Sequence, residues 1–152
     1  MNKLNAPLYF DVASAQPYLI SAGDSVKLAV IHHPRDSYDV SVIYEVWEVG
    51  GSQPINSHER STETFWFLSG NGIAYSDDNV VEVAAGGFLV LPPKSKHRIV
   101  NTGESRLYAI TTMSSDDGFA KLITSGTPTT FDQQDLEVLY GVVRTSSEQR
   151  ST

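Results

Sequence analysis

Short apolar runs alternate with clusters of Gly, Pro, Asn and Asp along residues 18–112. The runs are rich in Val, Ile, Tyr and Phe, which favour strands, and the clusters between them are typical of turns. Short strands at regular spacing, without helical segments between them, predict an all-β sandwich or barrel rather than an α/β fold. The expected strands are Tyr18–Ser21, Val26–Ile31, Val40–Val49, Glu63–Ser69, Gly72–Ser76, Val80–Val83, Phe88–Leu91, His97–Asn101 and Arg106–Thr112.

Helical spacing appears only after these runs. Asp132 is suited to cap a helix over residues 133–143, and Asp135 adds a negative charge to its first turn. A shorter helix is predicted over residues 118–124. The domain organisation expected is an N-terminal arm (1–17), a barrel (18–113), a C-terminal helical segment (114–143) and a disordered tail (144–152).

Two stretches in the middle of the chain carry the candidate chemistry. His58 and Glu63 lie close together at the start of one predicted strand, and His97 belongs to another. Side chains alternate along a strand, so Asn56 and His58 share a face, whereas Glu63 reaches the same point only if a turn or bulge intervenes. Two imidazoles and one carboxylate can hold a divalent metal and leave coordination positions open.

The alternation of side chains along a strand also predicts which residues surround this site. Phe65 and Phe67 share the face of Glu63, so we expect them to form an aromatic floor of a substrate pocket. Trp66 points the other way and is expected in core packing or on a dimer face.

These stretches resemble the two sequence motifs of the cupin superfamily. The first motif is matched by Gly50 or Gly51, His58, Glu63 and Gly70, with Asn56 in place of the first His; the second is matched by Gly86, Pro92, His97 and Asn101, with Lys94 in place of an inner Gly. The resemblance implies a double-stranded β-helix, the cupin jelly-roll barrel, here followed by one or two short C-terminal helices. It also implies a divalent metal at one end of the barrel and a homodimer.

Asn56 is the main departure from that pattern. It is a weak fourth metal ligand, or it holds a metal-bound water or ligand by a hydrogen bond, or it takes no part in the site. The remaining set of His58, Glu63 and His97 has the composition of the 2-His-1-carboxylate sites of non-haem iron oxygenases, and Fe, Mn, Ni or Zn would suit it. The competing interpretation is a degenerate barrel in which these groups only hydrogen-bond one another or water.

The amino-acid composition and net charge exclude several kinds of ligand and binding partner. The chain of 152 residues has no Cys, so a metal must be held by nitrogen and oxygen, and its net charge of −7 opposes binding to nucleic acid or to an anionic membrane. No apolar stretch has the length of a signal peptide or a membrane span, so a cytoplasmic location is expected.

The function predicted is that of a metal-dependent protein acting on a small organic molecule, with dioxygenase-type oxidation as the leading chemistry. The alternative is a non-catalytic cupin that binds a small molecule as a sensor or binding module. The sequence leaves open which of the two applies.

Overall fold

The structure, a computed structural model, describes residues 6–36 and 38–141, and the tail predicted at 144–152 lies outside them. A short 3-10 helix, Val12–Ser14, precedes the strands. The strands are β1 (Pro17–Leu19), β2 (Val26–His32), β3 (Val40–Trp47), β4 (Thr62–Ser69), β5 (Asn71–Ser76), β6 (Asn79–Ala84), β7 (Phe88–Leu91), β8 (His97–Asn101), β9 (Leu107–Ser114) and β10 (Thr127–Pro128). The helices are α1 (Phe119–Thr124) and α2 (Gln133–Tyr140).

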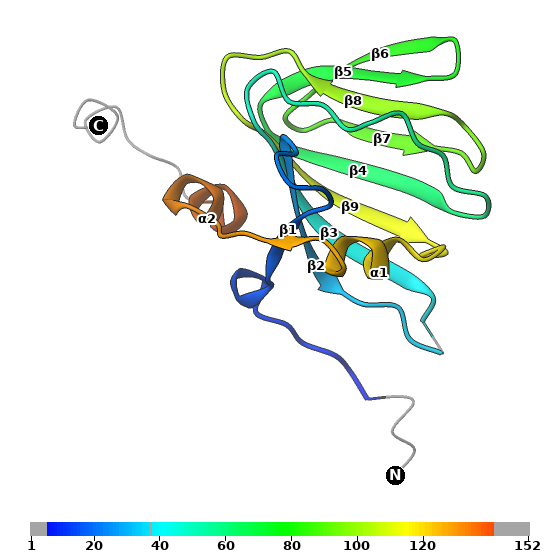
Figure 1. The fold of residues 1–152 in the computed structure, drawn as a ribbon, viewed down its shortest axis with the longest axis vertical. Helices are drawn as coiled ribbons and strands as arrows, with labels where there is room; N and C mark the ends of the chain where they lie inside the picture. The colour runs from blue at the N-terminus through cyan, green and yellow to red at the C-terminus, as the bar shows by residue number, and fades with distance from the viewer. Residues whose placement is uncertain (1–5, 37, 142–152) are drawn as a thin grey trace.

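Two antiparallel sheets form the barrel (Figure 1). The larger has the order β10-β1-β2-β3-β9-β4-β7, and the smaller has the order β6-β5-β8. Two isolated bridges, Ser52 to Val100 and Asn56 to His97, add the segment before β4 to the edge of the small sheet. The predicted all-β jelly roll with short C-terminal helices is therefore confirmed.

The strand pattern places an apolar core between the sheets. Ile43 and Trp47 from β3 meet Phe65 and Phe67 from β4 there, and all four side chains are buried. The Phe65 and Phe67 rings stack with centroids 6.0 Å apart. Trp66 lies on the opposite face of β4 and is 55% exposed, so it is not a core residue of this chain.

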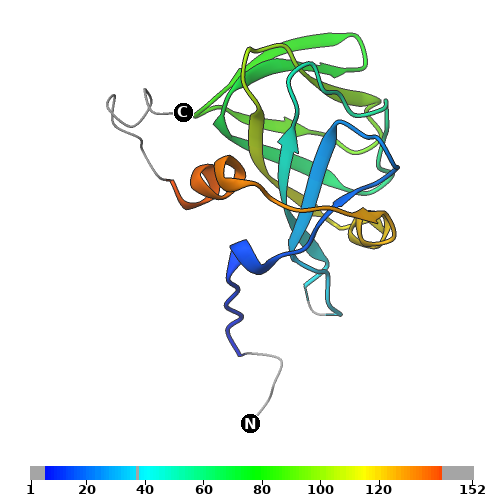
Figure 2. The ribbon, with the colours of Figure 1, turned by 60° about the vertical axis from the view of Figure 1, so that its left-hand side comes forward.

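A second apolar cluster lies on the outer face of the large sheet. Tyr44, Val46 and Tyr108 are buried there beneath Val138 and Leu139 of α2. Figure 2 shows the chain between α1 and α2 crossing outside the barrel, where β10 pairs with β1. No helix within residues 6–36 and 38–141 is long and apolar enough to span a membrane.

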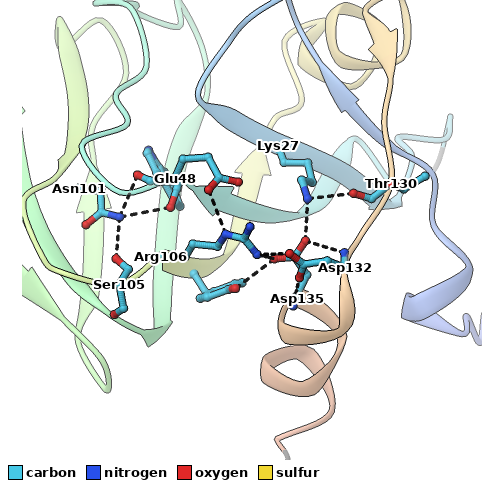
Figure 3. A network of polar contacts seen from close by, with 10 residues as sticks. Lys27, Glu48, Asn101, Ser105, Arg106, Thr130, Asp132 and Asp135 are labelled. Carbon is cyan, nitrogen blue, oxygen red and sulfur yellow. Dashed lines mark hydrogen bonds and ion pairs between the residues drawn. The ribbon is translucent and has the colours of Figure 1, made fainter. Parts of the chain in front are cut away.

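Asp135 fixes α2 to this face (Figure 3). Its carboxylate is fully buried, lies 2.7 Å from Lys27 Nζ and 3.2 Å from Arg106 Nη1, and accepts a hydrogen bond of 3.0 Å from the Tyr108 hydroxyl. Asp132 caps the helix as predicted, and its side chain and that of Asp135 form a reciprocal capping box. The C-terminal segment is thus held by charge as well as by apolar contact.

Candidate metal centre

Three polar side chains from separate segments meet at one end of the barrel. Glu63 comes from the start of β4, His97 from the start of β8, and His58 from the loop that precedes β4. Glu63 Oε2 lies 2.9 Å from His97 Nε2 and 3.4 Å from His58 Nε2. One potential ligand atom from each residue lies within 4.8 Å of the other two, which is close enough to surround one ion. His58 and Glu63 are an odd number of residues apart and would face opposite sides of an unbroken strand. The non-strand segment between them supplies the turn that brings both to one side.

Backbone hydrogen bonds hold the two histidine segments in register. The Asn56 N–H donates to His97 O at 3.0 Å, and the His97 N–H donates to Asn56 O at 2.8 Å. The Lys94 N–H donates to His58 O at 2.7 Å. Lys94 has a φ of +71°, a conformation that favours glycine, and it stands where the motif has glycine. The local backbone therefore keeps the geometry of the motif despite the substitution.

The tautomer of His97 follows from its other ring nitrogen. Nδ1 lies 3.0 Å from the carbonyl oxygen of Ser95. A carbonyl oxygen can only accept, so Nδ1 carries the proton, and in the neutral ring the lone pair of Nε2 faces Glu63. This arrangement, in which a backbone carbonyl fixes the tautomer, is common for histidines that bind metals.

The carboxylate of Glu63 is buried, but its Oε2 accepts no hydrogen bond. Glu63 Oε2, His58 Nε2 and Asn56 Oδ1 are all buried and have no hydrogen-bond partner. Oε2 is thus close to both imidazoles but is not aligned to accept a hydrogen bond from either. A divalent ion placed among His58, Glu63 and His97 would satisfy the unpartnered lone pairs of these three residues at once. The residues present therefore fit a metal.

The charge of Glu63 is favoured by the same neighbours. Burial by itself raises the pKa of this carboxyl, but a proton on the facing Nε2 of His58 or His97 outweighs burial and brings the pKa below its usual range. Glu63 is therefore ionised when the site takes up a metal ion.

The remaining predicted site residues have distinct surroundings. The amide oxygen of Asn56 is buried and unpartnered beside the triad, so both coordination and a hydrogen bond to a bound ligand stay open for it. Phe65 and Phe67 share the Glu63 face but are fully buried in the core, and neither borders the cavities described below. Their contact with a substrate stays a prediction.

Sequence reasoning missed a second interior carboxyl. Glu45 on β3 is fully buried, and its Oε2 accepts a 2.8 Å hydrogen bond from Gln53 Nε2. Burial, and next the charge of Glu63, raise the pKa of Glu45 well above its usual value, so it stays protonated. Its Oε1 and the nearby Thr111 hydroxyl have no hydrogen-bond partner. An acidic residue inside an otherwise apolar strand was the signal that could have identified it.

A cavity of about 290 Å³ opens at His58 and Asn56. A smaller recess of about 40 Å³ adjoins it, because the two share Asn56, Ile20 and Phe119 among the residues that line them. Phe119 of α1 packs edge-on against the His58 ring, with centroids 5.2 Å apart. A small molecule therefore has space beside the triad.

Comparison with known proteins agrees with this geometry. Residues 43–113, which include all three triad residues, match the family described as Cupin domain. An uncharacterised protein of Methanocaldococcus jannaschii is 26% identical over 88 residues, which cover 58% of this chain and 70% of that protein.

Solved structures show the same fold. A predicted oxalate decarboxylase from Thermotoga maritima superposes with a TM-score of 0.63 at 19% identity, covering 70% of this chain and 97% of that one. An RmlC-like cupin from Shewanella frigidimarina gives a TM-score of 0.60 at 14% identity, with 75% and 96% covered. At such identities the likeness concerns the fold.

Proposed function

We propose that this protein binds a divalent metal ion through His58, Glu63 and His97 and oxidises a small organic molecule with dioxygen. The observation that supports this most is the convergence of buried, unpartnered lone pairs at one point beside a cavity. In the structure, no hydrogen bond within the triad satisfies His58 Nε2 or Glu63 Oε2.

The donor set indicates the chemistry. Two imidazoles and one carboxylate are typical of non-haem iron oxygenases, and they also suit Mn, Ni or Zn. When bound, such an ion supplies Lewis acidity and, if it is redox-active, electron transfer to dioxygen. Three protein ligands leave room for the oxygen atoms of a substrate.

The protein residues would prepare the site for this ion. The Ser95 carbonyl orients His97 so that Nε2 is free to coordinate. Phe119 covers one edge of His58 and keeps water from that side. Asn56 is placed either to coordinate weakly or to hold a bound ligand by its amide.

The test is metal content followed by oxygen consumption. Protein purified without chelators should contain about one divalent ion, and His58→Ala or His97→Ala should weaken binding by more than the roughly 10–100-fold that loss of a supporting partner costs. His33→Ala is the matched control, because His33 is exposed and lies outside the triad. Equal metal retention by all four proteins would refute the assignment.

A non-catalytic binding module is the second candidate. Asn56 stands where a third imidazole is expected, and a weaker ligand set suits a protein that holds a ligand without converting it. An oxygen electrode separates the two functions: a binding module would retain metal and ligand but consume no dioxygen with any substrate that it binds.

The homodimer implied by the resemblance also stays a proposal. Trp66, Phe88 and Val90 leave much of their apolar surface exposed on neighbouring strands β4 and β7, which supports a contact with a second copy. Sedimentation of the wild type and of Trp66→Lys tests it, and a wild type that sediments as a monomer at all concentrations would contradict it.

A further inference from the structure

The cavity beside the candidate metal centre is lined by apolar side chains and by acidic residues, and residues 6–36 and 38–141 contribute no Lys or Arg to it. Its walls include the apolar side chains of Ile20, Pro54, Phe119 and Leu122. The smaller recess continues this apolar surface with Val26 and Leu28 from β2. A ligand that reaches the triad therefore lies along hydrocarbon over most of its length, and burial of that surface favours an apolar body.

The charged groups of this lining all have one sign. Asp24 borders both the cavity and the recess, and Asp117 borders the cavity. No Lys or Arg is among the described residues that line either space. Both carboxylates are fixed in place, because Asp24 Oδ2 accepts a 2.7 Å hydrogen bond from the Ser21 N–H and Asp117 Oδ2 accepts one of 3.1 Å from the Arg60 N–H.

The nearby cations are engaged elsewhere. Arg60 pairs with Asp117 at 3.3 Å, but its side chain is 74% exposed and does not border the cavity. Lys96 and Arg98, the cations that flank His97, line a different hollow, which His97 also borders, and Arg98 lies over the Tyr75 ring, 5.1 Å from its centroid. Among the described residues that line the cavity, the only side-chain groups able to bind an anion are therefore His58 and the neutral donors of Ser21, Asn56 and Ser57.

We propose that the ligand of this cavity carries a single oxygen-bearing head for the metal, an apolar body, and a far end that is neutral or cationic. This inference rests on the proposed function, because the head needs the metal ion. It excludes small dicarboxylates as preferred ligands, since a second carboxylate would lie in an apolar space bordered by Asp24 and Asp117 without a cation to pair with.

Three six-carbon probes test the inference. Hexanoate, adipate and 6-aminohexanoate each have one carboxylate head, and their sixth carbon is a methyl group, a second carboxylate or a methylene that carries an ammonium. Isothermal titration of the full-length protein loaded with Zn²⁺ should show hexanoate and 6-aminohexanoate binding at least about tenfold more tightly than adipate. Zinc is chosen because it accepts nitrogen and oxygen ligands and has no redox chemistry.

A charge-removing variant shows where discrimination arises. Asp24→Asn keeps an oxygen for the Ser21 N–H, and it should recover several-fold of the adipate affinity while leaving hexanoate binding unchanged. Asp78→Asn is the matched control, because Asp78 lies in the hairpin turn between β5 and β6 and does not border this cavity.

The outcomes separate this inference from the proposed function. If zinc does not bind, or binds equally to His97→Ala, the proposed metal centre fails. If zinc binds through the triad but adipate binds as tightly as hexanoate, or none of the probes binds, the inference on ligand class is overturned while the metal centre stands.

Discussion

Replacement of Asp135 by Ala should loosen the attachment of α2 to the barrel. The buried carboxylate neutralises Lys27 and Arg106, accepts a hydrogen bond from Tyr108, and completes the capping box with Asp132. Removing it leaves Lys27, whose side chain is only 12% exposed, beside the Thr130 carbonyl but without its ion-pair partner.

The size of the effect follows from these contacts. Loss of one partner from a buried ion pair costs about 3–5 kcal/mol, and loss of a cap costs about 1 kcal/mol. The two terms overlap because one carboxylate serves both, and Arg106 keeps its contacts with Asp132 and Glu48. We therefore expect the free energy of unfolding to fall by about 3 kcal/mol.

Urea denaturation of the full chain, monitored by tryptophan fluorescence, to which buried Trp47 and exposed Trp66 both contribute, measures this change. The corresponding decrease in Tm is about 6–12 °C for a protein of this size. Asp78→Ala removes an exposed aspartate from a turn and should stay within about 0.5 kcal/mol of the wild type. Were Asp135→Ala to lose less than about 1 kcal/mol relative to that control, the clamp would contribute little and the reasoning would be wrong.

Three further predictions concern the barrel interior. Asn56→His should raise metal affinity, measured by competition with a chelator, because imidazole is a stronger ligand than an amide oxygen; unchanged affinity would place Asn56 outside the coordination sphere. Metal occupancy should fall as pH drops below about 6.5, where free imidazole takes up a proton. Glu63 does not cause this loss, because its pKa lies below its usual range. Occupancy that is flat down to about pH 4 would contradict ligation by His58 and His97. Burial raises the pKa of Glu45, so the folded metal-free protein holds a proton that the unfolded chain releases above about pH 4.3, and the stability of the wild type falls as the pH rises above that value. Glu45→Gln carries no such proton and should gain stability relative to the wild type between about pH 4 and 7. A difference in stability that stays constant over this range would show that Glu45 is not protonated in the fold.

Local patterns in the sequence predicted the barrel closely. Phe88–Leu91 and His97–Asn101 have the predicted bounds, and the other predicted strands differ by a few residues at their ends. The short pairing of β10 with β1 was missed, since two residues give no periodicity to recognise. Spacing, together with the resemblance to the two cupin motifs, also predicted that His58, Glu63 and His97 meet, since the starts of β4 and β8 and the loop before β4 lie at one end of the barrel.

Contacts distant in sequence were beyond such reasoning. Lys27 and Asp135 are 108 residues apart, so the role of Asp135 as an ion-pair centre was not visible, although its place in the first turn of α2 was predicted. Glu45 was taken as part of an apolar strand. The packing of Phe119 on His58 depends on how α1 folds back over the barrel end, which no local pattern specifies.

The position of Phe119 also sets the order in which the site is completed during synthesis. All three triad residues leave the ribosome before this ring does, and the ring arrives only with the segment that follows the last long barrel strand. A nascent chain that extends only to residue 114 would lack the contact between Phe119 and the His58 ring. This wall of the cavity is thus completed late, by the segment that follows β9.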